Sequence, residues 1–489
     1  MAFATQWAQG SHHRDKQYPP FSVTSENVMT RDSLGGLAES LDSEVQWYFW
    51  TQAEKALHEM SDVESFRLAC AESILGLVHK PFKRDSEVVE SMEAREDRRR
   101  RGHHAPDDLM LEISKVISQD GPRKYMERAA RRMHTLKFKY DSAMKDTLRS
   151  SGADDVMDPV LYMSEDDQTS VGLLYWLAVM FDTVSSSMHH RPLVVPDQEC
   201  QHQDCADEDT DSPRWILDLF IQDQMDSPTQ RTQWPCSYEE LAEAVTRSGP
   251  VKVLLYRHVA WLQNSLRRGQ KREKIEEIIH SAMTLHRYWN ITYGKLFREL
   301  VRDFPLVPGR IQSWFVCISG HWHLAAMLLA DLVETVDKQG LGSSEGLRQR
   351  LKGRAVTTLR DTSAKELSDL ARVATPSHVD GGGACTVLPQ LPDFHPFVNE
   401  ATILTDPWTI ILIQAFSRAA VHLLAHADHC QEHALEAASG EWLAETVRRA
   451  EECVKGLWLL GKKSDVARKV ADILTDELTV NHGTVVSFS

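Results

Sequence analysis

The most concentrated group of potential metal ligands in this sequence is a run of four histidines in one predicted helix. They are His422, His426, His429 and His433, separated by 4, 3 and 4 residues. This spacing places the four imidazoles on one stripe of an α-helix. Imidazoles at positions i and i+4 can share one Zn²⁺ ion, but four ligands on a straight helix cannot surround a tetrahedral ion. A metal site here therefore needs a ligand from another segment; otherwise the stripe is a polar helix face in water.

A second group of potential ligands is the acidic sequence DDVMD. Its carboxylates are Asp154, Asp155 and Asp158. The pattern matches the DDxxD motif with which class I terpene synthases and prenyltransferases hold Mg²⁺ against a diphosphate. The companion motif of those enzymes fails, because the nearest candidate, Asn264, lacks the Ser/Thr and Glu that should follow it. DDVMD also lies between Gly152 and Pro159, so we interpret it as a solvated acidic turn, with Mg²⁺ binding as the alternative.

Two further groups of histidines and cysteines carry a weaker signal. Cys200, His202 and Cys205 are of zinc-ligand type, but no second ligand pair lies near them in the sequence. His321 and His323 lie in a segment that is apolar on most faces, and residues two apart point to different sides of a helix. We therefore interpret these two as hydrogen-bonded core histidines, and we assign no catalytic residue.

Three clusters of Lys and Arg are candidates for phosphate contacts or nuclear import. The first runs from Arg98 to Arg101. The second consists of Arg128, Arg131, Arg132, Lys137 and Lys139. The third, at a predicted helix junction, consists of Arg267, Arg268, Lys271, Arg272 and Lys274. A solvated helix face is the commoner explanation for clusters of this kind.

The segments that must position these residues are predicted to be helical. From Leu41 onward apolar residues recur at helix spacing, and no strand-type alternation is longer than a few residues. The predicted helices include 172–190, 237–247, 251–268, 272–303, 310–338, 345–360, 364–373, 436–460 and 464–477. Asp406 and Pro407 are placed as N-cap and first residue of another helix. The sequence therefore predicts an all-α fold class.

We divide the chain into one large multi-helical domain and two tails. Residues 1–40 are polar and aperiodic and are predicted to be a disordered tail, and residues 478–489 form a C-terminal tail. The domain spans residues 41–477 and carries two exposed loops. One is the acidic segment 197–211, with seven carboxylates and no Lys or Arg, and the other is the segment 375–395.

Composition places the chain among ordinary globular proteins of a reducing compartment. Its 489 residues are 42% hydrophobic and 26% charged, which excludes a disordered chain, a collagen and a coiled-coil rod. The net charge of -16 argues against general affinity for nucleic acid. Eight scattered cysteines without a CxxC pair predict reduced thiols. No signal-peptide core and no stretch of 18 apolar residues is found, so we expect no membrane span.

Long segments, in order along the chain, resemble the regulatory domain of fungal binuclear-zinc-cluster transcription factors, also called the middle homology region. Residues 44–77 resemble its opening. Residues 168–195 resemble its signature helix, with Phe181, Asp182, Arg191 and Pro192 at the expected places. The resemblance continues in 249–263, 288–301, 310–334, 399–419 and 452–467, and so covers about residues 41–475.

The resemblance implies a regulatory protein of the nucleus, with the cytoplasm as the other compartment. It would control a metabolic or secondary-metabolite gene cluster. The family's zinc-cluster DNA-binding module is not found, since residues 1–69 contain no cysteine. We therefore expect indirect contact with DNA through protein partners, for example a zinc-cluster transcription factor, and leave a homodimer open. No cofactor is expected on this interpretation.

The alternative is an enzyme built on the same helical domain, although we favour a role that is not enzymatic. Its sharpest form is a Mg²⁺-dependent, terpene-cyclase-like activity, with the three aspartates of DDVMD as metal ligands. The missing zinc cluster and the histidine stripe motivate this alternative. A ligand sensor with an apolar pocket among the helices is a third interpretation.

Overall fold

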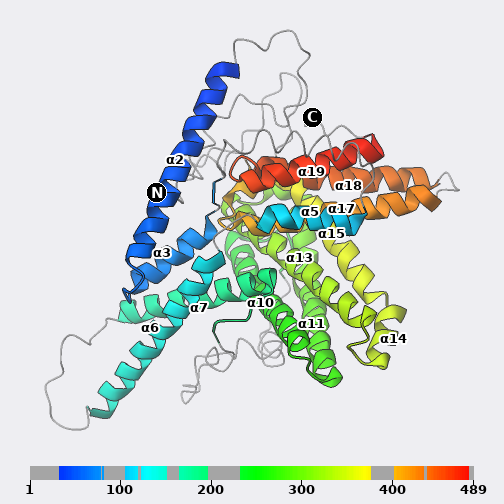
Figure 1. The fold of residues 1–489 in the computed structure, drawn as a ribbon. Coiled ribbons are helices and arrows are strands. Elements are labelled where there is room, and N and C mark those ends of the chain that lie inside the picture. Colours follow the sequence, from blue (N-terminus) through cyan, green and yellow to red (C-terminus); the bar gives the residue numbers. More distant parts are fainter. Residues whose placement is uncertain are drawn as a thin grey trace.

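The structure is a computed structural model that describes most of the chain. The described residues are 32–78, 80–81, 105–118, 123–150, 165–195, 232–375, 401–433 and 438–483. Within these ranges every regular element is an α-helix or a short 3-10 helix, and none is a strand. The predicted all-α class is therefore confirmed (Figure 1).

Two sets of helices make up the described part of the chain. The first set is α2 (Asp32–Glu59), α3 (Phe66–Leu77), α5 (Pro106–Ser118), α6 (Arg123–Ser150) and α7 (Glu165–His189). The second set begins with α10 (Tyr238–Arg267), α11 (Arg272–Thr292), α12 (Gly294–Arg302), α13 (Gly309–Lys338), α14 (Ser344–Lys352) and α15 (Ala355–Ala374). It ends with α17 (Thr409–His433), α18 (Ala438–Leu460) and α19 (Asp465–His482). The 3-10 helices η4 (Phe304–Leu306) and η5 (Thr402–Thr405) precede α13 and α17.

Helices that are distant in the sequence share one large apolar core. In Figure 1, α17, α18 and α19 (orange to red) pack together, and α5 (cyan) lies against α17 and α19. The central helix is α13, which contacts α10, α15 and α17 and buries Phe315, Trp322 and Leu329 completely. The helices α2, α3, α6 and α7 lie on the other side of α10, with smaller apolar clusters between them.

Serine side chains fix the start of several helices. The hydroxyl of Ser237 accepts the N–H of Glu240, and the Glu240 carboxylate accepts the N–H of Ser237, which makes a capping box for α10. Ser65 and Ser464 cap α3 and α19 by accepting the N–H of the third residue after them. Each cap satisfies a donor at a helix end and contributes about 1 kcal/mol.

The boundaries predicted for the two tails are corrected by the structure. The disordered tail predicted for residues 1–40 is wrong over its last part, because α2 begins at Asp32. Leucines at 34, 37 and 41 continue the helix spacing, but the glycine pair between the first two obscures it in the sequence. The C-terminal tail predicted for 478–489 begins too early, because α19 continues to His482 and ends at Gly483 in the left-handed conformation.

Two interior predictions are also corrected. The helices predicted at 237–247 and 251–268 are one helix, α10, with Pro250 inside it. Both halves bury apolar residues in the same core, and this burial outweighs the loss of one backbone donor at the proline. Conversely, the helix predicted at 272–303 is broken at Tyr293 into α11 and α12. Asp406 does accept the N–H of Trp408, but α17 begins at Thr409.

Within the described ranges, three helices are long and apolar enough to cross a membrane, by length and composition only. They are Thr169–His189, Gly309–Lys338 and Thr409–His429. Between 61% and 78% of each apolar window is buried inside the fold. Packing between helices therefore accounts for this apolar character, and the absence of a membrane span stays a prediction.

The close approach of α13 and α17 depends on a residue without a side chain. A Cβ atom at Gly320 would overlap with Cδ2 of Leu412, which is itself fully buried. Leu370 of α15 lies on the same side, 3.7 Å from that position. We expect Gly320→Val to lower the free energy of unfolding by roughly 1–3 kcal/mol, the usual cost of overpacking a core.

Chemical denaturation of the purified chain measures this effect. The matched control is Gly172→Ala on α7, where an added Cβ meets nothing within 4 Å. We expect that control to be neutral or stabilising by up to about 1 kcal/mol, because alanine favours the helix. Equal stability of the two variants would contradict the close packing of α13 on α17.

Candidate functional site

Several predicted site residues lie outside the described part of the chain. These are Asp154, Asp155, Asp158, Cys200, His202 and Cys205. The acidic segment 197–211, residues 376–395 and the basic cluster at 98–101 lie there as well. The interpretation of DDVMD, as an acidic turn or as a Mg²⁺ site, therefore stays a prediction.

The histidine stripe lies on α17, and α15 supplies the outside ligand that a metal site would need. Oδ1 of Asp361 lies 2.7 Å from Nε2 of His422 and 3.4 Å from Nε2 of His426. The three ligand atoms lie within 4.8 Å of one another. His429 is exposed outside this group, and the side chain of His433 is outside the described part. We call Asp361, His422 and His426 the Asp–His–His group.

The ionisation of the Asp–His–His group follows from burial and from its neighbours. Burial alone would raise the pKa of Asp361, but the hydrogen bond with His422 and the charges of His426 and Lys365 lower it overall. Burial lowers the pKa of His426, and the nearby His422 lowers it further. At neutral pH the carboxylate is therefore ionised and the His426 imidazole is neutral, which are the forms that bind metal ions.

A charged network beside this group holds the same helices together. Asp331 of α13 pairs with Arg360 of α15 at 2.8 Å and with Arg418 of α17 at 2.5 Å. Glu334 of α13 also pairs with Arg360, at 2.8 Å. Arg360 immediately precedes Asp361, so the network fixes the backbone that carries the carboxylate. The ring of Trp442 on α18 borders the group, 6.4 Å from the His426 ring.

A second cluster of metal-ligand residue types is buried where α13, η5 and α17 meet. Oδ2 of Asp406 lies 2.9 Å from Nε2 of His321, and Sγ of Cys317 lies 3.7 Å from the same nitrogen. The ammonium of Lys463 donates to the backbone carbonyls of Leu404 and Asp406 at 2.8 and 3.0 Å. Asp406, His321 and Lys463 are each at most 4% exposed.

The ionisation of this buried cluster follows from burial and from the charges within it. Burial alone would lower the pKa of His321, but Cys317 and Asp406 raise it to about 9. The charge of His321 in turn outweighs burial and lowers the pKa of Asp406. Burial lowers the pKa of Lys463 to about 8. At neutral pH the cluster is an imidazolium–carboxylate pair beside an ammonium, and His321 is a hydrogen-bonded core histidine, as expected from the sequence.

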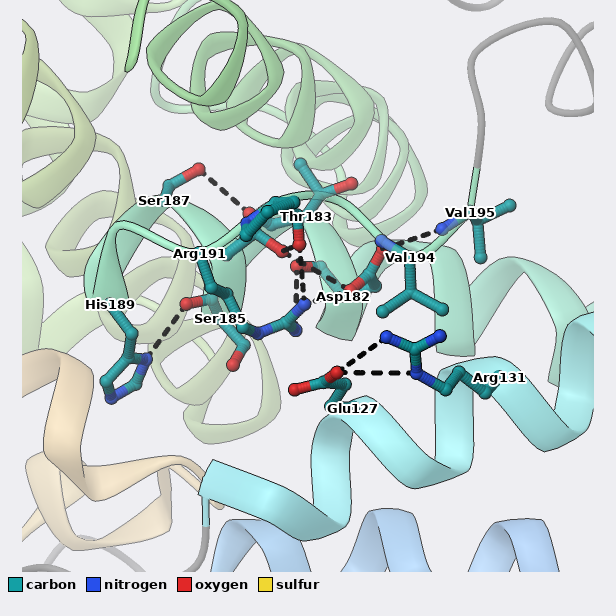
Figure 2. Close-up of polar contacts among 12 residues, drawn as sticks. Glu127, Arg131, Asp182, Thr183, Ser185, Ser187, His189, Arg191, Val194 and Val195 are labelled. Atoms are coloured by element: carbon teal, nitrogen blue, oxygen red, sulfur yellow. Dashed lines mark hydrogen bonds and ion pairs between the residues drawn. The ribbon is translucent and has the colours of Figure 1, made fainter. Parts of the chain in front are cut away.

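The segment that resembles the signature helix ends in a buried network around one carboxylate (Figure 2). Asp182 of α7 is fully buried and pairs with Nη1 of Arg191 at 2.7 Å. It also accepts the backbone N–H groups of Val194 and Val195, at 2.8 and 3.1 Å. Asp182 therefore fixes the conformation of the chain where it leaves α7, and the residues of the resemblance have a structural role here.

A buried arginine that sequence reasoning missed connects the same region to α10. Arg257 is fully buried and donates to Oγ1 of Thr183 at 2.9 Å and to the carbonyl of Val195 at 3.1 Å. Ser187 donates to the carbonyl of Tyr256 at 2.7 Å, which adds a second link between α7 and α10. Neither contact has a local sequence signal, because the partners are 62 to 74 residues apart.

The second and third basic clusters differ in how their charges are used. On α6, Arg128 and Arg132 both pair with Glu72, whose side chain is fully buried. The other three residues of that cluster pair with Glu127, Asp141 and Glu64. In the third cluster, Arg267 donates to the carbonyl of His190 and Lys274 pairs with Glu277. Its remaining residues, Arg268, Lys271 and Arg272, are exposed and have no acidic partner in the described part.

Two hollows in the described surface lie beside α6 and are lined by charged side chains. The first, about 270 Å³, is lined by Glu64, Arg128, Arg131, Arg132, Thr135 and Leu136. The second, about 310 Å³, lies between α2 and α6, next to the ion pair of Lys124 with Glu54. Neither hollow contains the Asp–His–His group or the buried cluster, so neither joins a cavity to a reactive side chain.

A GxSxG sequence at 342–346 also lacks the setting of a catalytic serine. The nucleophile elbow of hydrolases places this motif between a strand and a helix. Here the motif follows α13, and its central serine, Ser344, is the first residue of α14. Ser343 caps that helix by accepting the N–H of Gly346 at 3.0 Å. The motif therefore serves as the start of a helix.

Comparison with known proteins finds no relative for this chain. No protein-family model, no curated protein and no solved structure matches it. The functional interpretation therefore rests on the geometry of the chain itself, and the resemblance to a fungal regulatory domain enters as a proposal.

Asp182 is expected to be a large contributor to stability. Replacing it by asparagine leaves the guanidinium of Arg191, which is only 13% exposed, without its counter-charge. Breaking a buried ion pair in this way costs roughly 3–5 kcal/mol, so we expect Asp182→Asn to lower the free energy of unfolding by about 3 kcal/mol. The matched control is Glu127→Gln, which removes the exposed pair with Arg131 in Figure 2 and should cost less than about 1 kcal/mol. A small loss for Asp182→Asn in chemical denaturation would contradict this role.

Buried neutral histidines are expected to make the fold acid-sensitive. His258 is 2% exposed, and burial lowers its pKa to about 4. Its stabilising contribution is therefore complete above the unfolded pKa near 6.5 and is lost as the pH falls from there towards 4. By pH 5 the loss is on the order of 2 kcal/mol for this one residue.

Denaturation of wild type and His258→Gln at pH 7.5 and pH 5 measures this contribution. We expect the variant to lose less stability over this interval than the wild type does, because glutamine does not titrate. Parallel pH dependences of the two proteins would show that His258 gains a proton in the folded state as readily as in the unfolded state.

Proposed function

We propose that the chain is a transcription-factor-like regulatory protein that acts in the nucleus through protein partners. The resemblance of about residues 41–475 to the fungal regulatory domain supports the proposal. The observation that carries it is that buried polar side chains in the resembling segments bind other parts of the fold. Asp182, Arg257 and Asp406 are buried and bind other parts of the fold, and they line neither of the two hollows beside α6. Such residues hold helices in place, which suits a scaffold for partners better than an active site.

The distribution of charge supports binding to proteins over direct binding to DNA. Affinity for DNA comes mainly from Lys and Arg that neutralise phosphates, and this chain has a net charge of -16. The five residues of the basic cluster on α6 are already paired with carboxylates. Three exposed cations remain at the turn between α10 and α11, namely Arg268, Lys271 and Arg272. A small basic turn of this kind suits an acidic protein surface, such as that of a nuclear import receptor.

The genes under control are proposed from the resemblance alone. It implies a metabolic or secondary-metabolite gene cluster, with the DNA contact supplied by a partner that carries a zinc cluster. The partner would read the DNA sequence, and this chain would bring regulatory contacts to it. On this proposal the chain needs no cofactor of its own for regulation.

Tethering tests the regulatory function directly. The full chain is fused to a heterologous DNA-binding module, and a reporter gene carries the binding sites of that module. We expect a several-fold change in reporter transcription relative to the module alone. The Glu127→Gln fusion should act like wild type, whereas Asp182→Asn should lose the effect because its fold is weakened. A transcript profile of a deletion strain then identifies the gene set.

One pattern of results would contradict the proposal. The reporter would not respond to the wild-type fusion, and transcripts in the deletion strain would stay level while one metabolite disappeared. That combination would indicate an enzyme on the same helical scaffold. The DDVMD aspartates would then be the first residues to replace.

A further inference from the structure

The Asp–His–His group has a geometry that goes beyond an ordinary hydrogen bond between a histidine and an aspartate. Two imidazoles from one helix direct Nε2 at the same carboxylate oxygen, at 2.7 and 3.4 Å. Their rings are 4.5 Å apart and tilted by 56°. Convergence of three ligand atoms on one small volume is the arrangement found around a metal ion.

Two of the three distances between ligand atoms can be compared with those of a tetrahedral site. Ligand atoms at 2.0–2.1 Å from a tetrahedral Zn²⁺ ion are roughly 3.3 Å from one another. The distance between Oδ1 of Asp361 and Nε2 of His426 is 3.4 Å, which is within about 0.1 Å of this value. The distance between Oδ1 of Asp361 and Nε2 of His422 is 2.7 Å. It would have to lengthen by roughly 0.6 Å, which a small side-chain rotation allows.

The surroundings of the group suit an exchangeable ion with an open position. The side chains of Asp361, His422 and His426 are 29%, 14% and 38% exposed, so solvent reaches the group. Both helices that carry it are held by Asp331, through Arg360 and Arg418. Two imidazoles and one carboxylate leave at least one coordination position for water or a ligand. Imidazole favours zinc and similar transition metals, whereas Mg²⁺ prefers oxygen ligands.

We propose that Asp361, His422 and His426 bind one divalent transition-metal ion, with Zn²⁺ as the occupant. The ion would join α15 to α17, next to Trp442 of α18. It would stabilise this part of the fold, because a ligand that binds only the folded state shifts unfolding to higher temperature. The site is independent of the regulatory function proposed above, so either proposal can fail alone.

Competition with a chromogenic chelator tests the site on the full chain after its metal has been stripped. We expect the wild type to withdraw one equivalent of Zn²⁺ from the chelator, and an excess of Mg²⁺ to leave that equivalent in place. His422→Ala, His426→Ala and Asp361→Asn should each weaken binding by more than about tenfold. His429→Ala is the matched control, because His429 lies on the same helix outside the group and should leave the affinity unchanged.

A variant that gains a spectroscopic signal distinguishes a change of metal ligand from a loss of binding caused by misfolding. Cysteine is also a ligand for zinc and cobalt, so His426→Cys should keep a three-ligand site. With Co²⁺ as the probe, we expect this variant to gain a thiolate charge-transfer band in the near ultraviolet that the wild type lacks. Zn²⁺ should also raise the thermal unfolding midpoint of the wild type and leave that of Asp361→Asn unchanged.

Either of two results would overturn the proposal. One is equal Zn²⁺ affinity in wild type and Asp361→Asn, which would assign the binding to the background of 22 histidines in the chain. The other is the absence of any tight equivalent in the wild type. Asp361 would then serve only as a hydrogen-bond acceptor between α15 and α17.

Discussion

One buried carboxylate joins the helices that position the Asp–His–His group. Asp406 is 1% exposed, and its side chain binds His321 of α13 and the N–H of Trp408 at the start of α17. Its backbone carbonyl binds Lys463, in the turn between α18 and α19. A buried charge without partners would cost several kcal/mol, so these helices have to meet at this point. Their arrangement then determines where α17 runs, and hence where His422 and His426 face α15.

Buried carboxylates that pair with cations also occur on α3 and α7. Glu72, fully buried on α3, pairs with two arginines of α6, and Asp182, fully buried on α7, fixes the chain that follows that helix. Asp406 is the third such carboxylate. Glu72 and Asp406 take their cations from another helix, so each specifies one pairing of helices among the many that apolar faces alone would allow, whereas Asp182 pairs with Arg191 only nine residues later. Apolar burial supplies most of the stability, and the three carboxylates contribute specificity.

The sequence predicts helices well here and contacts between them poorly. Apolar spacing identified most helices, but the proline in α10 and the glycine pair in α2 obscured parts of these two helices in the sequence. In α10, burial on both sides of Pro250 outweighs local propensity. The histidine stripe and its need for an outside ligand follow from helical periodicity alone. Asp361 could not be named, because it lies 61 residues before His422 in a helix that carries two other carboxylates, Glu366 and Asp369. Asp361 can be identified only from the packing of α15 against α17, which brings its carboxylate next to His422.

Two clusters of the described chain hold similar ligand types, and charge distinguishes them. Around His321 the carboxylate of Asp406 is already balanced by an imidazolium, and the ammonium groups of Lys252 and Lys463 act on the same pair. A divalent cation there would meet three positive charges in a medium that screens them poorly. Around Asp361 two imidazoles converge on one carboxylate oxygen, and the side chain of His426 is 38% exposed, so water has access to the ligand atoms. The buried cluster is therefore a junction of the fold, whereas the Asp–His–His group retains the capacity to bind.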